Sequence, residues 1–173
     1  CKGEDYSHEL SEIDSLKKVL VSTDSLIASL NTADITRRTQ DIADNSKFIQ
    51  FNVNKLGDTL DYSTALLLTE YRETGNKYSF MNQELVRLSN AIDSMNTGLE
   101  NLKHDLENHS LAEGIDGKAS VVHESTQVNA IHSYANELKS SLENTRKSYD
   151  TLLPKVNAYV NMMSARVATV QVP

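Results

Sequence analysis

Apolar residues recur at intervals of three and four along most of the chain, which is the spacing of a heptad seam in packed helices. The clearest stretch covers residues 81–109, where the steps alternate four and three without a break. Its seam positions are Met81, Leu85, Leu88, Ile92, Met95, Leu99, Leu102 and Leu106. The pattern predicts a helix with one buried face. Thr74-Gly75-Asn76 is interpreted as the turn before it, with Asn76 or Ser79 as the N-cap.

The last third of the chain carries the same spacing over a longer distance. Its seam positions are Val128, Ile131, Ala135, Leu138, Leu142, Thr145, Tyr149, Leu152, Val156, Tyr159 and Met163. Pro154 falls at an outward position, where it removes one hydrogen bond but does not interrupt the seam. We therefore expect a helix that kinks at Pro154 and continues. Residues 110–119, with two glycines, predict a loop before it, and Ser120 is a candidate cap.

A third seam is predicted over residues 35–71. Its positions are Ile35, Thr39, Ile42, Ser46, Ile49, Val53, Leu56, Leu60, Ser63 and Leu67. A second apolar stripe, on the outward face of the same predicted helix, consists of Phe48, Phe51, Tyr62 and Ala65. Such a stripe implies either another helix of the bundle or a partner protein.

The first predicted helix covers residues 6–30. Its seam positions are Ile13, Leu16, Leu20, Thr23, Ile27 and Leu30. Leu30 and Ile35 cannot share one heptad frame, and Asn31 and Asp34 have the spacing of a capping pair. The pattern favours a tight helical hairpin at this point. The alternative is one very long helix with a shift of register, which would make the first segment a stalk.

Together these seams predict an all-α fold, an elongated up-down bundle of four helices with coiled-coil-like seams. We expect residues 6–170 to form a single bundle domain, residues 1–5 a tether and residues 171–173 a tail. The alternative is a three-helix bundle with an N-terminal helical stalk. Because the last predicted helix is the longest, the part after Pro154 is expected to project, and Tyr159, Met162 and Met163 would form an adhesive end.

Composition changes this picture little. The chain has 173 residues with 6 glycines, 2 prolines and no tryptophan, as expected for long helices with few interruptions. The net charge of -7, with both signs interspersed, argues against nucleic-acid binding. No run approaches the roughly 20 apolar residues of a transmembrane helix.

Residue patterns for catalysis or metal binding are absent from the sequence. No two of the 5 histidines lie three or four residues apart, and no Glu-x-x-His pair of a di-iron bundle occurs. There is no Gly-x-Ser-x-Gly nucleophile elbow and no phosphate-binding glycine loop after a strand. We therefore predict no enzyme, no catalytic, metal or cofactor residues, and no small-molecule substrate.

The single cysteine is Cys1, and the chain begins there rather than at a methionine, as expected of a cleaved precursor or of a fragment. The start Cys1-Lys2-Gly3-Glu4-Asp5 resembles that of mature bacterial lipoproteins, and its acidic pair resembles that of surface-exported lipoproteins of Bacteroidota-type bacteria. The resemblance covers only these residues. It implies a covalent lipid on Cys1 and attachment to a membrane, most simply the outer membrane, on its periplasmic face or at the cell surface.

The sequence thus favours a lipid-anchored bacterial envelope protein that acts as a structural, scaffolding or protein-binding subunit of a larger assembly. The candidate contacts to partner proteins are Phe48, Phe51, Tyr62, Tyr159, Met162 and Met163. One alternative is a soluble homo-oligomeric coiled-coil adaptor without lipid. Another is a bundle that carries a small ligand or metal in its core.

Overall fold

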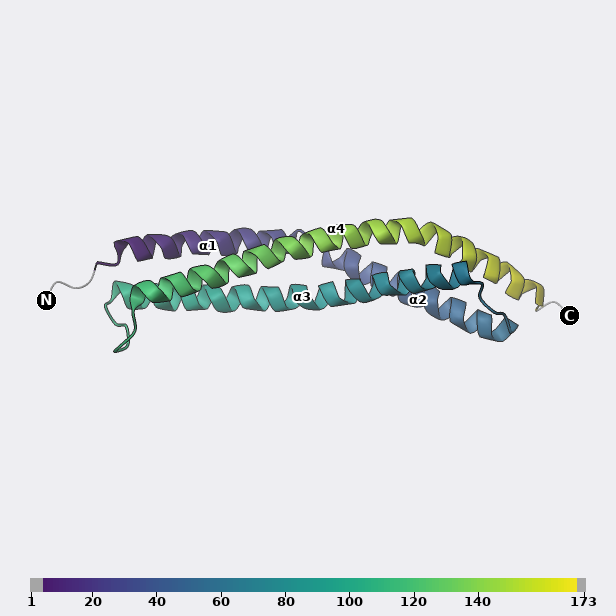
Figure 1. The fold of residues 1–173 in the computed structure, drawn as a ribbon, viewed down its shortest axis with the longest axis horizontal. Coiled ribbons are helices and arrows are strands. Elements are labelled where there is room, and N and C mark those ends of the chain that lie inside the picture. Colours follow the sequence, from purple (N-terminus) through teal and green to yellow (C-terminus); the bar gives the residue numbers. More distant parts are fainter. Residues whose placement is uncertain (1–4, 171–173) are drawn as a thin grey trace. The chain divides into compact units, whose positions relative to one another are not determined.

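The computed structural model describes residues 5–170, except the side chain of Val170, and these residues form four α-helices and no strand (Figure 1). The helices are α1 (Ser7–Ala28), α2 (Thr32–Leu56), α3 (Tyr62–Glu107) and α4 (Gly117–Val170). The all-α class and the four helices predicted from the sequence are confirmed. Apart from Asp5, the predicted tether 1–5 and tail 171–173 lie outside the described residues.

The chain divides into two compact units, although the sequence pattern predicts a single bundle over 6–170. Unit 1 contains α1, the end of α3 from Glu84 and the start of α4 up to Lys139. Unit 2 contains α2, the start of α3 up to Gln83 and α4 from Ser140. Each unit is therefore a packing of three helical segments.

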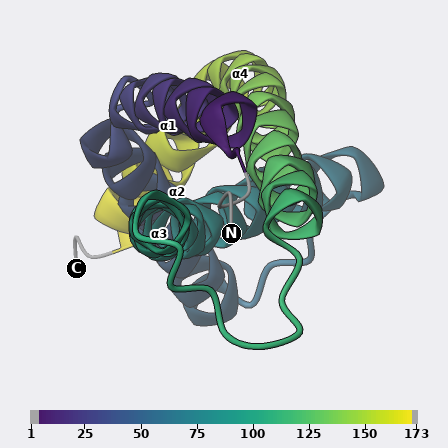
Figure 2. The ribbon, with the colours of Figure 1, turned by 90° about the vertical axis from the view of Figure 1, so that its left-hand side faces the viewer.

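In unit 1, α1 runs antiparallel to α3 and parallel to α4. Asp14 accepts a hydrogen bond of 2.7 Å from Lys103 of α3, while Lys17, one turn later, forms an ion pair with the earlier residue Glu100. Thr23, near the end of α1, lies 2.8 Å from a ring nitrogen of His132 in α4. The turn at residues 108–116 reverses the chain between α3 and α4 (Figure 2).

Unit 2 repeats this arrangement with α2 in the place of α1. The Tyr149 hydroxyl of α4 donates a hydrogen bond of 3.1 Å to Asp41, early in α2. Arg166, near the end of α4, pairs with Asp58 just after α2, at 2.5 and 3.0 Å. The order of these contacts makes α2 and α4 parallel.

The cores consist largely of the predicted seam residues. In α4, nine of the eleven predicted positions are buried, and Ile131 and Tyr159 are half-buried. In α3, Met81, Leu85, Leu88, Ile92, Leu99 and Leu106 are buried. Burial of a leucine or isoleucine side chain contributes roughly 1.5–3 kcal/mol before the entropy of ordering is subtracted. The seams are thus the main source of stability in both units.

The predicted continuous helix over 35–71 is wrong, because α2 ends before Gly57. Gly57 adopts a left-handed backbone with φ 64°, and Asp58 N–H donates back to the Val53 carbonyl at 3.1 Å. This is the Schellman ending that glycine favours. Asp61 then begins α3 by accepting a hydrogen bond of 3.0 Å from the Thr64 N–H.

The predicted turn at residues 74–76 is also wrong, because these residues lie inside α3, and neither Asn76 nor Ser79 caps a helix. Gly75 allows α3 to pack closely against α2. A Cβ atom built on it would lie 2.9 Å from Cγ2 of Ile42, so α2 approaches α3 where the side chain is missing. In a sequence, a glycine suggests that a helix is interrupted. Close contact with a neighbouring helix explains a glycine in a helix interior equally well.

The chain passes from α1 to α2 at Asn31, and these two helices, predicted to form a tight hairpin, belong to different compact units. Asn31 has a left-handed backbone with φ 53°, and its side chain accepts a hydrogen bond of 3.1 Å from the Asp34 N–H. The predicted Asn31–Asp34 capping contact therefore occurs, and it starts α2.

The predicted helix across Pro154 is confirmed, and Pro154 is exposed. Ser120 is not the cap of α4, because the helix begins at Gly117. Asp116 performs this role by accepting hydrogen bonds from the N–H groups of Lys118 and Ala119 at 2.9 and 3.2 Å.

Two glycines of α3 provide a matched test of the close contact. We expect Gly98→Ala to raise the free energy of unfolding by about 0.5–1 kcal/mol, because nothing lies within 4 Å of the added Cβ and alanine favours the helix. Gly75→Ala should instead lower it by about 1–2 kcal/mol, since overpacking against Ile42 outweighs the same gain. Urea unfolding measures both, and equal stabilisation by the two substitutions would contradict the contact.

Candidate functional site

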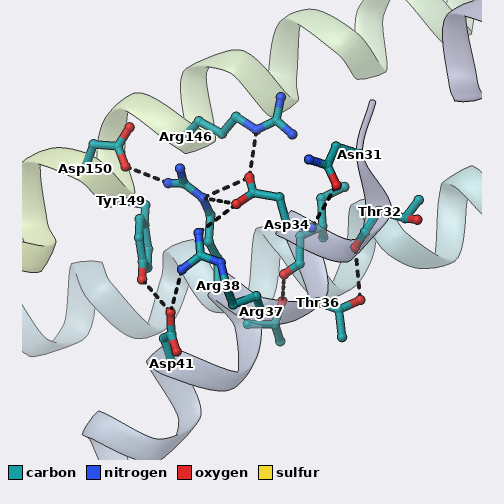
Figure 3. Close-up of polar contacts among 12 residues, drawn as sticks. Asn31, Thr32, Asp34, Thr36, Arg37, Arg38, Asp41, Arg146, Tyr149 and Asp150 are labelled. Carbon is teal, nitrogen blue, oxygen red and sulfur yellow. Dashed lines mark hydrogen bonds and ion pairs between the residues drawn. The ribbon is translucent and has the colours of Figure 1, made fainter. Parts of the chain in front are cut away.

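The most extensive group of polar contacts in unit 2 joins the start of α2 to α4 (Figure 3). We call it the α2–α4 cluster, and its members are Asp34, Arg37, Arg38, Asp41, Arg146, Tyr149 and Asp150. On α2 the spacing 34, 38, 41 places three of these residues along one face, and on α4 the spacing 146, 149, 150 does the same. The cluster therefore follows directly from two parallel helices.

Asp34 is the anionic centre of this cluster. Its carboxylate accepts hydrogen bonds from Arg37 at 2.7 Å and from Arg38 at 3.0 and 3.1 Å, and it lies 3.3 Å from Arg146. Burial raises the pKa of Asp34, but the hydrogen bonds from Arg37 and Arg38 outweigh it and leave the pKa below its ordinary value. Its place in the first turn of α2 also suits a negative charge.

Arg38 links α2 to α4 through three contacts. Its guanidinium donates to Asp34 on its own helix and to Asp150 of α4 at 2.6 Å. It also lies 4.6 Å from the centre of the Tyr149 ring, in cation–π geometry. Burial lowers the pKa of Arg38, yet the hydrogen bonds to Asp150 and Asp34 raise it above its ordinary value, so the group stays charged.

Three tyrosines form the apolar side of the cluster. The Tyr149 ring stacks on Tyr71 at 6.1 Å with an interplanar angle of 23°, and meets Tyr78 edge-on at 6.1 Å and 73°. The Tyr71 hydroxyl accepts a hydrogen bond of 3.2 Å from Asn45 of α2. Burial raises the pKa of each of the three phenols. Two tyrosines of α3 thus pack against Tyr149 of α4, the same ring that Arg38 contacts.

The Tyr78 hydroxyl is buried, and its polar neighbour is the Arg38 guanidinium rather than a well-aligned hydrogen-bond partner. The nearby charge of Arg38 opposes the effect of burial on its pKa. The ring at this position contributes through its edge-on packing against Tyr149.

The α2–α4 cluster is therefore built for structure. Its three arginines all pair with aspartates of the same cluster. The arrangement fixes the rotation of α2 relative to α4, because a turn of either helix would separate Arg38 from Asp150 and from the Tyr149 ring.

The predicted partner contacts are spread over unit 2 and differ in exposure. Phe51 and Tyr62 are 66% and 84% exposed, and Met162 is 45% exposed. Phe48 and Tyr159 are half-buried. Met163 is buried at 0% exposure and belongs to the core, so it drops out of the contact surface.

The single outward stripe predicted through Phe48, Phe51, Tyr62 and Ala65 does not exist as one helix face. The first two residues lie on α2 and the last two on α3, because the chain breaks at Gly57. Cys1, the predicted lipid-bearing residue, lies outside the described residues.

Metal and membrane features are absent from residues 5–170. No group of three or more histidine, cysteine or acidic side chains there converges to hold a metal ion. None of the helices in this range combines the length and apolar character needed to cross a membrane.

Comparisons with protein-family models, with curated proteins and with solved structures find no match to this chain.

The structural role of Arg38 is testable against its neighbour. Arg38→Met should lower the free energy of unfolding by about 1–2 kcal/mol, because it removes the contacts to Asp150 and to the Tyr149 ring that join α2 to α4, while Asp34 keeps Arg37 and Arg146. Arg37→Met also removes a positive charge that pairs with Asp34, but Arg37 is exposed, so the free energy of unfolding should be nearly unchanged. Urea unfolding at low salt measures the difference, and similar losses in the two variants would show that charge alone matters.

Proposed function

We propose that this chain is the helical body of a lipid-anchored bacterial envelope protein, which serves as a structural, scaffolding or protein-binding subunit of a larger assembly. The observation that carries the proposal is the exposure of large aromatic side chains on a well-packed helical unit. Phe51 is 66% exposed and Tyr62 is 84% exposed. Exposed aromatic residues are enriched where proteins bind one another.

The build of unit 2 supports a role as a rigid support for these residues. Phe51 lies on α2 close before its ending at Gly57, and Tyr62 is the first residue of α3. The bidentate contact between Arg166 and Asp58 ties the connection between them to α4. A partner would therefore meet side chains presented by fixed backbone, which reduces the entropy cost of binding.

The membrane part of the proposal rests on the segment Cys1-Lys2-Gly3-Glu4-Asp5. A lipid on Cys1 would hold the chain at a membrane, and the outer membrane, on its periplasmic face or at the cell surface, is the proposed location. The proposed work requires no catalytic residue, because partner binding and spacing depend only on shape and surface.

The anchor is tested by changing its single residue. Cys1→Ser in the full precursor should move the protein from the membrane fraction to the soluble fraction, because the thiol that accepts the lipid is gone. Mass spectrometry of the native N-terminus should find the acyl mass on the unaltered protein. A Ser variant that stays in washed membranes without any partner would contradict the anchor.

The contact surface is tested by photo-cross-linking in cells. A benzoylphenylalanine in place of Tyr62 should form a discrete adduct with a partner protein of the envelope, because this side chain is open to contact. Val122 of unit 1, which is 62% exposed, provides the matched control position. No adduct at Tyr62, or the same adducts at both positions, would argue against this surface.

A further inference from the structure

A cleft of about 260 Å³ lies between α2 and α3 in unit 2. Its floor is apolar and consists of Ile49 and Val53 of α2 and Leu68 of α3, while Leu60 of the connection lines it from an exposed position. Ile49 and Leu68 are buried at 2% and 6% exposure, so the floor is continuous with the core. Water against this apolar floor finds few hydrogen-bond partners, and an apolar group that displaces it there gains stability.

The rim of this cleft is polar. Gln50 and Asn54 lie one helical turn apart on α2, and Arg72 lines the cleft from α3. Each amide can both donate and accept a hydrogen bond, while Arg72 offers only donors and a fixed positive charge. The three groups thus surround an apolar floor with donors at its edge.

Arg72 differs from other arginines of the described chain in having no acidic partner. Ion pairs to aspartate or glutamate are made by Arg37, Arg38, Arg87, Arg146 and Arg166. Arg72 makes no hydrogen bond or ion pair with any residue in the range 5–170. Its guanidinium therefore remains available to an anion from outside the chain.

We infer that this cleft binds a small amphipathic anion, a carboxylate on a short apolar body. The apolar body would lie on the floor formed by Ile49, Val53 and Leu68, and the carboxylate would accept hydrogen bonds from Arg72. Ligand pockets for drug-sized molecules hold about 300–1,000 Å³, so this smaller cleft suits a short-chain acid. The site is independent of the proposed partner surface, because neither Phe51 nor Tyr62 lines it.

A second cleft, in unit 1, provides a comparison for the first. It has about 250 Å³ and is lined by Arg87, Leu88 and Tyr134 among others. Its arginine is already paired with Glu84 at 2.6 Å, and the same glutamate accepts a hydrogen bond from Tyr134. The unit 1 cleft therefore has a similar size and an arginine, but this arginine is already held in an ion pair within the chain.

The test uses three probes with the same eight-carbon chain, namely octanoate, 1-octanol and octylammonium, the two ions below their micelle concentrations and the alcohol below its solubility limit. Binding to the full chain is followed by amide chemical shifts. Octanoate should bind most tightly and octylammonium least, with shifts concentrated at residues 46–54 and 60–72. Arg72→Gln should weaken octanoate binding about tenfold and leave 1-octanol unchanged, since one charge-assisted contact is lost.

Two further variants make the result decisive. Arg87→Gln removes an equal charge beside the unit 1 cleft and should leave octanoate binding unchanged. Val53→Phe should fill the cleft and weaken all three probes together, while circular dichroism confirms that the helices remain. The inference is overturned if Arg72→Gln binds octanoate as tightly as the unaltered chain, if Arg87→Gln weakens it equally, or if the shifts lie outside the cleft.

Discussion

Burial of the apolar seams of α3 and α4 is the constraint on which both units depend. Each of these helices supplies one segment to unit 1 and another to unit 2, and each segment presents its seam to a third helix. The heptad spacing keeps the seam on one face over many turns, so the same rule serves both units. Where the third helix changes from α1 to α2, the chain needs only the left-handed Asn31 to end one helix and start the next.

The seams leave the rotation of α2 loosely defined, because its buried apolar residues are three isoleucines, and such a band packs acceptably over a range of angles. Polar and aromatic contacts remove this freedom in unit 2. Arg38 reaches Asp150 and the face of Tyr149, and Gly75 allows Ile42 to approach α3. These contacts require one rotation and one height, so they specify the packing that the apolar seam stabilises.

Sequence reasoning succeeded where one physical rule decides the outcome. The seam from Val128 to Met163 and the outward position of Pro154 depend only on helical period, and they could be predicted. Sequence reasoning failed where the same residue type can have two different structural roles. Gly75 looked like a turn and is a packing site, whereas Gly57 looked like part of a helix and ends it. Their difference depends on which helix lies opposite, and a single sequence does not contain that information.

The α2–α4 cluster was missed for a related reason. The spacing of Asp34, Arg38 and Asp41, and that of Arg146 and Asp150, was visible as charges at helical intervals. Charges at such intervals usually lie on a solvated face. Recognising a cluster requires knowing that α2 runs parallel to α4, which follows only from the pairing of helices in unit 2. The outward aromatic stripe failed in the same way, because Phe51 and Tyr62 lie on two helices.

The interleaving of the two units has a consequence for biosynthesis. Thr23 and His132 are 109 residues apart in the chain, and Arg38 and Asp150 are 112 apart. Neither unit is a continuous piece of sequence. The α4 segment that completes unit 1 ends at Lys139, and the segment that completes unit 2 begins only at Ser140, so α2 waits for its α4 partner until nearly the whole chain is made. Until then each unit has only two of its three helical segments and its apolar seam is partly uncovered, which slows folding and creates a period in which a chaperone would protect the nascent chain.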